Sequence, residues 1–320
     1  MKFASKIVAL CAVMAVLGAA LLLGDIFSPQ RVQARTTGRP LLGALSPKSI
    51  EGMDIVYKGT SLASLRLTTA GWEATSGSRT YPASVERISL FLRIMGGLRQ
   101  GRLASADSAQ FPELGLGEEA HRLVLHAGQG GSLELLVGKR GPSGDEDYVL
   151  SSGTAAAYLV RGSLSFFLAQ NPSYWYELHA LPLEVEGASI ESIRVSGSLE
   201  LAGPPAASLG GSYTLLREKG PKGERWSLQG EAEGANQLAA GAMANSLAQL
   251  EGELFAEAAP AGHPRLVVDL KTRDGKNYSL SLWPGQVPGE TLVTASWSPW
   301  TYIVADLPLR RAIPRAAGLR

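Results

Sequence analysis

Apolar and polar positions divide the chain into an N-terminal apolar run and a body of mixed pattern. After Lys2 and Lys6, the eighteen residues from Ile7 to Gly24 carry no charge and are rich in Leu, Val and Ala. A helix of this length rises about 27 Å at about 1.5 Å per residue, close to the hydrocarbon thickness of a bilayer. The pattern therefore predicts a membrane segment within residues 1–24.

The same run also fits a secretory signal, with a basic start and a candidate cleavage site at Val32-Gln33-Ala34. We favour an uncleaved anchor, because the run exceeds the usual apolar length of about 7 to 15 residues in such signals. Residues 25–45 then form a spacer that contains arginines. Large downstream domains cross membranes largely regardless of flanking charge, so we expect an extracytoplasmic body on a single-pass inner-membrane anchor. The alternative is a secreted or periplasmic protein after signal cleavage.

The body repeats one order of patterns twice, about 145 residues apart. The alternating segment Ile50–Val56 recurs as Ile190–Val195. A hairpin pattern that ends in tryptophan follows each one, at Leu65–Trp72 and at Leu215–Trp226. Two copies of one sheet-forming unit are the simplest interpretation.

A helical pattern follows each predicted hairpin. In the first copy, apolar residues recur at spacings of three and four, with Pro82 placed to open the helix; they are Val85, Ile88, Phe91, Leu92, Met95 and Leu98. In the second copy, Asn236 is a candidate N-cap, and the same spacing relates Met243, Leu247, Leu250 and Leu254. Each copy therefore predicts one amphipathic helix.

Strand patterns then return in both copies. They pair Arg122–Leu125 with Arg265–Leu270, Ser132–Leu135 with Ser279–Leu282, and Tyr158–Val160 with Tyr302–Val304. We predict an α+β protein with two similar ββαββββ units, at residues 46–180 and 187–310, each a mostly antiparallel sheet with its helix packed on one face. The arginine-containing tail 311–320 has no acidic residue, and we expect it to be frayed or to contact acidic groups.

Composition narrows the function classes. The chain has 30 Lys+Arg against 29 Asp+Glu, a net charge of +1, which gives no electrostatic basis for binding nucleic acid. Its one cysteine, Cys11, lies in the apolar run, so the body has no thiol for a disulfide, a metal site or a nucleophile.

Motifs for catalysis or cofactor binding are missing from the sequence. The histidines lack the spacing of a zinc site, and we expect surface or strand-edge positions for them; they are His121, His126, His179 and His263. Contiguous Asp145-Glu146-Asp147 lacks the alternation of a calcium loop and predicts a solvated hairpin tip. We therefore expect no catalytic residue, no metal and no cofactor.

Aromatic residues are the candidates for binding. They cluster near the ends of the two predicted units, as Tyr174, Trp175 and Tyr176 in the first and Trp283, Trp297 and Trp300 in the second. We favour a structural role, in which they fill an interface between the units or cap the cores, because tryptophan buries a large area. The alternative is a platform for a glycan, a peptide or a partner protein.

Several segments together resemble the bacterial family called domain of unknown function 4340. They are Gly71-Trp72, Tyr81–Ala83, Phe111–Leu116, Leu135–Gly138, Tyr148–Leu150 and Tyr158–Val160, in this order. The resemblance covers about residues 50 to 180 and extends more weakly into the second copy. It implies a membrane-anchored extracytoplasmic protein, often encoded beside components of an ABC transport system linked to gliding motility. It provides no catalytic residue to carry over.

The resemblance and the predicted anchor together favour a non-enzymatic accessory or binding component of an ABC-type transport complex. Its expected partners are the membrane, through Ile7–Gly24, and transporter subunits. The competing hypothesis is an enzyme that acts on envelope glycans, or a glycan-binding protein, with the aromatic residues as its substrate platform.

Overall fold

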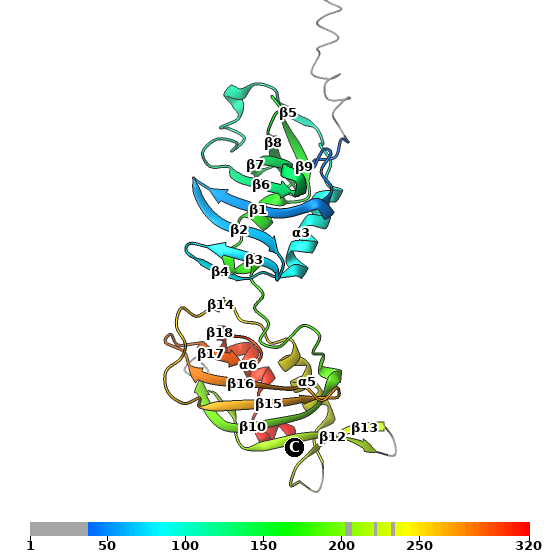
Figure 1. Cartoon of the computed structure of the whole chain (residues 1–320), viewed down its shortest axis with the longest axis vertical. Coiled ribbons are helices and arrows are strands. Elements are labelled where there is room, and N and C mark those ends of the chain that lie inside the picture. Colours follow the sequence, from blue (N-terminus) through cyan, green and yellow to red (C-terminus); the bar gives the residue numbers. More distant parts are fainter. Residues whose placement is uncertain (1–37, 202–206, 221–222, 232–233) are drawn as a thin grey trace, which may run out of the picture. The chain divides into compact units, whose positions relative to one another are not determined.

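The computed structural model describes residues 38–201, 207–220, 223–231 and 234–320. The chain divides between Glu177 and Leu178 into two units, each built on its own antiparallel sheet (Figure 1). The predicted membrane segment, Cys11 and residues 25–37 of the spacer lie outside the described residues. Within the described part, none of the helices has the length and apolar character needed to cross a bilayer. The α+β class with two antiparallel sheet units is confirmed.

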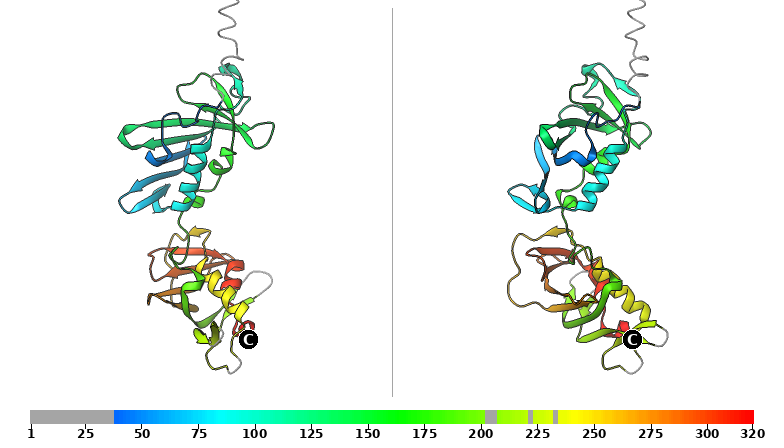
Figure 2. Two further views of the ribbon diagram at one scale, coloured as in Figure 1. Left: turned by 90° about the vertical axis from the view of Figure 1, so that its right-hand side faces the viewer. Right: turned by 45° about the vertical axis from the view of Figure 1, so that its right-hand side comes forward.

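In the described residues of the first unit, nine strands form one sheet in the order β4-β3-β2-β1-β6-β7-β8-β9-β5. Helix α3 (Val85–Gly97) begins at the N-cap Ser84, whose hydroxyl accepts from the Arg87 N–H, and packs on one face of the sheet (Figure 2). Helix α4 (Leu164–Leu168) lies beside it, since Phe167 contacts Phe91 at 5.4 Å. The strands are β1 (Ile50–Tyr57), β2 (Thr60–Thr68), β3 (Gly71–Ser76), β4 (Arg79–Pro82), β5 (Leu103–Ser105), β6 (His121–Ala127), β7 (Ser132–Arg140), β8 (Glu146–Ser151) and β9 (Ala157–Arg161).

In the described residues of the second unit, the sheet order is β13-β12-β10-β15-β16-β17-β18-β14, with β11 paired to the far end of β10. Helix α5 (Gln237–Ala248) begins at Asn236, whose side chain accepts from the Ala239 N–H as the sequence predicts. Helix α6 (Asp306–Ala312) follows the last strand. The strands are β10 (Ile190–Leu201), β11 (Ala207–Gly210), β12 (Tyr213–Gly220), β13 (Gly223–Leu228), β14 (Leu254–Phe255), β15 (Leu266–Thr272), β16 (Asn277–Pro284), β17 (Glu290–Ala295) and β18 (Thr301–Ala305).

The two sheets share one plan. The strands β3-β2-β1-β6-β7-β8-β9-β5 of the first sheet follow the same order as β13-β12-β10-β15-β16-β17-β18-β14 of the second, whereas β4 and β11 have no counterpart. In the chain, each main helix comes after the first group of strands and before the short edge strand, β5 or β14. Even the pairing irregularity recurs, between Ile50 and Gly52 in β1 and between Ile190 and Ser192 in β10. Bulges of this kind are retained features of related sheets.

Alternation along the strands produces each core. Met53, Ile55 and Leu65 point toward α3 and are at most 1% exposed, and Ile193, Val195 and Leu215 repeat this arrangement in the second unit. Fully burying one such side chain stabilises the fold by about 1.5 to 3 kcal/mol. Residues between them point to the opposite face of each sheet, which no helix among the described elements covers. These uncovered faces are the surfaces that the fold offers to other molecules.

Three predictions of detail need correction. Each unit has nine strands among the described residues rather than the six of ββαββββ. A third long strand, β3 or β13, precedes the helix, and β4, β5, β11 and β14 are too short to give a periodic pattern. Each unit also has a second helix that is too short for such a pattern. The predicted spacer ends inside the first unit, where Leu41 and Leu42 are buried. The predicted second helix ends at Ala248, so Leu250 and Leu254 follow it.

The arginine-containing tail is packed rather than frayed. Leu319 is fully buried, and its carbonyl accepts from the Asn236 N–H at 2.8 Å. Arg320 pairs with Glu231 at 2.7 Å, and Arg315 with Glu200 at 3.8 Å. The tail therefore contacts acidic groups of its own unit.

The described residues also contain short 3-10 turns, which are η1 (Pro47–Ser49), η2 (Ser108–Gln110), η3 (Gly128–Gly130), η4 (Pro172–Trp175), η5 (Gly187–Ser189) and η6 (Ala316–Leu319).

Candidate functional site

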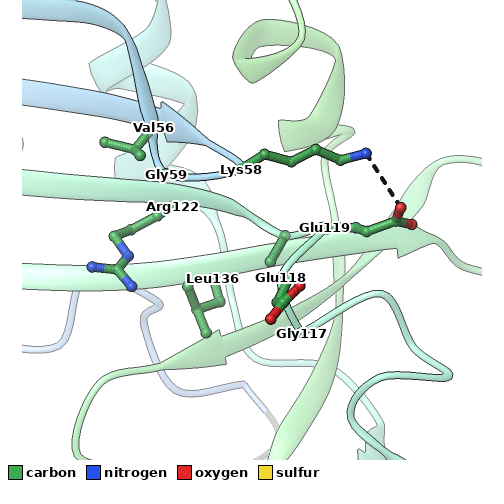
Figure 3. Close-up of a pocket in the computed structure, with 9 residues that line it drawn as sticks. Val56, Lys58, Gly59, Gly117, Glu118, Glu119, Arg122 and Leu136 are labelled. Carbon is green, nitrogen blue, oxygen red and sulfur yellow. Dashed lines mark ion pairs between the residues drawn. The ribbon is translucent and has the colours of Figure 1, made fainter.

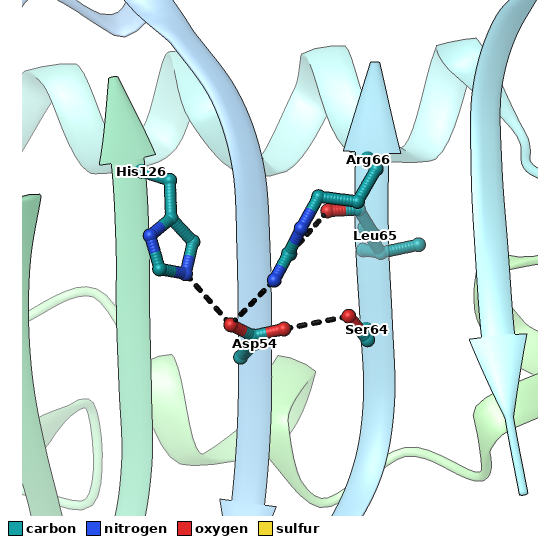
Figure 4. A network of polar contacts seen from close by, with 5 residues as sticks. All are labelled: Asp54, Ser64, Leu65, Arg66 and His126. Atoms are coloured by element: carbon teal, nitrogen blue, oxygen red, sulfur yellow. Dashed lines mark hydrogen bonds and ion pairs between the residues drawn. The ribbon is translucent and has the colours of Figure 1, made fainter. Parts of the chain in front are cut away.

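A polar network lies at the centre of the uncovered face of the first sheet (Figure 4). Asp54 on β1 accepts hydrogen bonds from Ser64 Oγ at 2.7 Å and from the Arg66 guanidinium at 2.8 Å. His126 on β6 places Nε2 2.7 Å from the second Asp54 oxygen, the one that Arg66 also contacts. One carboxylate therefore joins three neighbouring strands, with α3 behind them on the other face of the sheet.

Strand register explains why these side chains meet. Asp54 pairs with Ser64 across β2, whereas Arg66 and His126 both lie opposite Gly52, one from each side. Gly52 leaves room for Arg66 to cross over β1, because a Cβ added to this glycine would lie 3.1 Å from Arg66 Cδ. The glycine is thus what allows the guanidinium to reach Asp54.

The network favours the ionised carboxylate. Burial opposes ionisation of Asp54, but the hydrogen bonds from Arg66, Ser64 and His126 outweigh it and lower its pKa from 3.8 to about 2. Asp54 is therefore a carboxylate at neutral pH. Its side chain is 24% exposed, while those of Arg66 and His126 are 46% and 39% exposed. The outer groups of the network are accessible to a binding partner.

The geometry differs from that of a nucleophilic triad. Ser64 and His126 lie on opposite sides of β1, and each binds the carboxylate of Asp54. In a triad the histidine binds the hydroxyl and removes its proton. Here the aspartate occupies the central position instead, so the arrangement fixes three side chains in place on the sheet surface.

A pocket of about 550 Å³ lies beside the network, at the end of the same face (Figure 3). Val56, Arg122 and Leu136 form a row across β1, β6 and β7 and line it. Two ion pairs border it, Lys58 with Glu119 at 3.3 Å and Arg122 with Glu134 at 3.3 Å. Apolar side chains next to paired charges are a combination found in protein-binding surfaces.

Comparison with known proteins gives one match. The model of the family described as domain of unknown function (DUF4340) matches residues 72–263, more than half of the chain. The chain belongs to the DUF4340 family. The matched region begins in β3 and ends before β15, so it includes parts of both units. No curated protein and no solved structure matches the chain.

The DUF4340 chain carries different side chains at the equivalent point of its second sheet. Arg194 stands where Asp54 stands in the first sheet, since it lies two residues after the shared bulge, and it lies directly opposite Asp269. Lys271 likewise occupies the position of His126, opposite Ser192 rather than Gly52. A pocket of about 490 Å³ includes these residues. The two uncovered faces therefore have a common plan and opposite charge at the centre.

The first three predicted aromatic residues lie within the family match and mainly build the core. Trp175 is 1% exposed and contacts Phe91 edge-on at 5.6 Å. Tyr176 is buried against Tyr81 at 4.7 Å. Tyr174 is half-buried, and the Arg87 guanidinium lies 5.2 Å above its ring. These contacts agree with the structural role that we favour for this cluster.

The other three aromatic residues lie beyond the family match, in the second unit. Trp297 is 42% exposed and its indole N–H donates to the Ala180 carbonyl at 2.9 Å. Trp300 lies 5.1 Å from the ring of Phe255. Trp283 is half-buried, and its N–H donates to Gly262 at 3.4 Å. The structure places Trp283 on the uncovered face of the second sheet, in the floor of a groove.

One prediction about polar residues needs correction, and another is met in part. His121 and His126 lie on β6, a central strand, and His126 is 39% exposed, which fits the surface position expected for it. His121 stacks on Tyr57 at 4.5 Å, and burial lowers its pKa although the charge of Asp147 opposes this. In the predicted hairpin tip, Asp145 is exposed and pairs with Arg161. Asp147 is fully buried instead, and it accepts hydrogen bonds from the backbone N–H and the hydroxyl of Ser165.

Among the described residues, histidines, aspartates and glutamates do not gather into a group able to hold a metal ion. The Asp54 network was not anticipated from the sequence. A signal for it exists in the two strand patterns, since Asp54 interrupts an apolar strand and His126 ends another on the same face. Their pairing depends on register, which the sequence alone does not specify.

Proposed function

We propose that the chain is a non-catalytic binding component of an ABC-type transport complex, anchored by Ile7–Gly24 with its body outside the cytoplasm. Family membership supports this proposal, since the resemblance to the family implies a membrane-anchored extracytoplasmic protein, often encoded beside ABC transport components. The apolar run supports the anchor because its length suits a bilayer.

The observation that carries the proposal is the uncovered face of the first sheet. Its central charges are bound to one another, in the Asp54 network and in the Arg122–Glu134 pair, next to the apolar side chains of Val56 and Leu136. Paired charges cost less to bury under a partner than unpaired charges do, and the apolar side chains of Val56 and Leu136 supply the favourable burial. This surface suits a protein partner better than a small substrate.

Affinity purification of the full-length, detergent-solubilised protein, followed by mass spectrometry, tests the proposal. We expect an ABC permease or ATPase to co-purify. Leu136→Arg, on the pocket floor, is expected to reduce that recovery at least about tenfold, since it buries an unpaired charge in the contact. Ser279→Arg, on the uncovered face of the second sheet, is the matched control and is expected to leave recovery unchanged. Circular dichroism checks that both variants fold.

A protein that purifies alone, or that cleaves envelope glycans, would overturn the proposal. Topology has its own test, protease treatment of cells whose outer barrier has been removed. We expect the body to be digested in these intact cells. Protection until the inner membrane is permeabilised would place the body in the cytoplasm and contradict the proposed location.

A further inference from the structure

A second surface, on the uncovered face of the second sheet, has the form of a groove of about 640 Å³. Its floor is a row of apolar side chains on adjacent strands, since Trp283 pairs with Leu292 and Leu292 pairs with Ile303. Leu254 on β14 pairs with Ile303, extends the row by one strand and is 45% exposed. The row therefore crosses β16, β17, β18 and β14 without a polar side chain.

The walls of the groove also contain apolar residues. The loop from Ala256 to Ala261, which leaves β14 and stands away from the sheet (Figure 2), contributes alanines and Pro260 on one side. Pro284 and Val287 line the groove as well, and Val287 is 55% exposed. An accessible row of large apolar side chains between such walls indicates a surface that another molecule covers.

The charge of the groove has one sign. Among the described residues that line it, Glu257 and Glu290 are the charged ones, and lysine and arginine are absent. A ligand with a negative charge is therefore disfavoured, and positive groups beside apolar ones complement the surface.

Strand pairing identifies the position in the first unit that corresponds to Trp283. Val137 pairs with Val149, which pairs with Tyr158, and Leu282 pairs in the same way with Val293 and Tyr302. Gly138 therefore stands at the position of Trp283.

At this position the first unit is covered by its own chain. The segment Phe111–Leu116 lies so close to β7 that a Cβ on Gly138 would be 2.4 Å from the Leu114 carbonyl, and Lys139 N–H donates to that carbonyl at 3.0 Å. The row in the first sheet thus holds an irregular polypeptide segment. In the second sheet Trp283 replaces the glycine. The corresponding loop there, Ala256–Ala261, follows β14 as Phe111–Leu116 follows β5, but it stands away from the sheet and leaves the groove between them.

We propose that this groove binds an extended segment of a partner polypeptide that carries apolar side chains together with lysine or arginine. The floor row contacts the apolar side chains, and Glu290 pairs with a positive one. Pro284 stands at the position of Lys139 and has no N–H, so recognition depends on side chains more than on the backbone hydrogen bond seen in the first unit. The proposal rests on the proposed function in that the chain acts by binding another protein.

Fluorescence anisotropy with the full-length, detergent-solubilised protein tests the proposal. The probe is a labelled peptide in which leucine and valine alternate with serine, with an arginine at each end. Two further peptides replace the arginines with glutamates or the apolar residues with serines. We expect saturable binding of the arginine peptide and at least about tenfold weaker binding of both others.

Variants then locate the binding site. Glu290→Lys and Val287→Asp are both at the surface of the groove and are expected to weaken binding of the arginine peptide about tenfold. Glu218→Lys, on β12 and three strands away from β16, is the matched control and is expected to bind like the natural chain. Equal affinity for the three peptides, absence of binding, or equal affinity of the Glu290 and Glu218 variants would overturn the proposal.

Two outcomes separate this proposal from the proposed function. If the peptide does not bind but transporter subunits still co-purify, the groove proposal fails and the proposed function stands. If the peptide binds in the groove but no transporter subunit is recovered, the groove proposal stands and the proposed function fails. A dimer of the chain that Glu290→Lys dissociates would make a second copy the occupant and would also overturn the groove proposal.

Discussion

The side-chain amide of Gln237 makes two hydrogen bonds of 2.7 Å to the backbone of Trp226, accepting from its N–H and donating to its carbonyl. Trp226 lies on β13, the edge strand of the second sheet. The amide thus occupies the place that the backbone of a neighbouring strand would take. The first residue of α5 closes the middle of an edge that is otherwise suited to pairing with another chain.

Replacing Gln237 with alanine is expected to destabilise the protein by about 1 to 2 kcal/mol, because two backbone groups lose their partners. It also exposes the edge of β13 and is expected to increase self-association. Urea unfolding and sedimentation measure the two effects. Gln229→Ala, a change at an exposed glutamine just after β13, is the control and should alter neither property.

Acid is expected to weaken the Asp54 network. The pKa of Asp54 is lower in the folded chain than its ordinary value of 3.8, so its ionisation stabilises the fold above about pH 4, and this contribution is lost as the pH falls through about 2. Asp54→Asn should therefore lower the free energy of unfolding by up to about 2 kcal/mol near neutral pH, with a difference that shrinks toward pH 2. Urea unfolding across this pH range provides the measurement.

Asp269→Asn is the control for this experiment, since Asp269 is an exposed aspartate on the uncovered face of the second sheet. It should change the free energy of unfolding less than Asp54→Asn does. If the Asp54 and Asp269 variants have parallel profiles, the network does not stabilise the fold.

Buried and exposed tryptophans are expected to differ in how much their replacement by alanine destabilises the fold. Trp175→Ala should cost about 3 to 5 kcal/mol, because it opens a cavity next to Phe91 in the first core. Trp297→Ala removes a 42% exposed ring and one hydrogen bond to Ala180, and should cost about 1 kcal/mol. Unfolding of the two variants in urea checks this order, and equal costs would contradict it.

The C-terminal segment is expected to stabilise the second unit. Leu319 is fully buried, so Leu319→Ala should cost about 2 to 4 kcal/mol. Leu307→Ala makes the same change at a position that is 62% exposed in α6, and should cost less than about 0.5 kcal/mol. Thermal unfolding of both variants provides the comparison. A small effect at Leu319 would mean that the packed tail contributes little.

Much of the fold could be predicted because both copies contain long periodic segments. The alternation in Ile50–Val56 and the helical spacing from Ile88 to Met95 depend on local geometry, which the sequence expresses directly. Short elements such as β14 and α4 could not be predicted. They are stabilised by contacts with distant strands, as when Leu254 pairs with Ile303, and two to five residues are too few to establish a period.

The candidate sites were harder to predict than the fold. Trp283 was identified as a candidate, but the groove around it depends on the register that aligns it with Leu292 and Ile303. The Asp54 network depends in the same way on register and on the space above Gly52. Tryptophans attract notice because they are rare, whereas an aspartate and a histidine in ordinary strands do not.

The opposite charges of Asp54 and Arg194 bear on how the chain folds. Two copies of one sheet plan in a single chain give each strand a wrong partner during folding, and misassembly of this kind is common in repeat proteins. If β1 took the place of β10, Asp54 would face Asp269, and if β10 took the place of β1, Arg194 would lie beside Arg66. Like charges in such positions destabilise strand pairs. Both crossed assemblies are therefore penalised, which favours pairing of each strand within its own sheet.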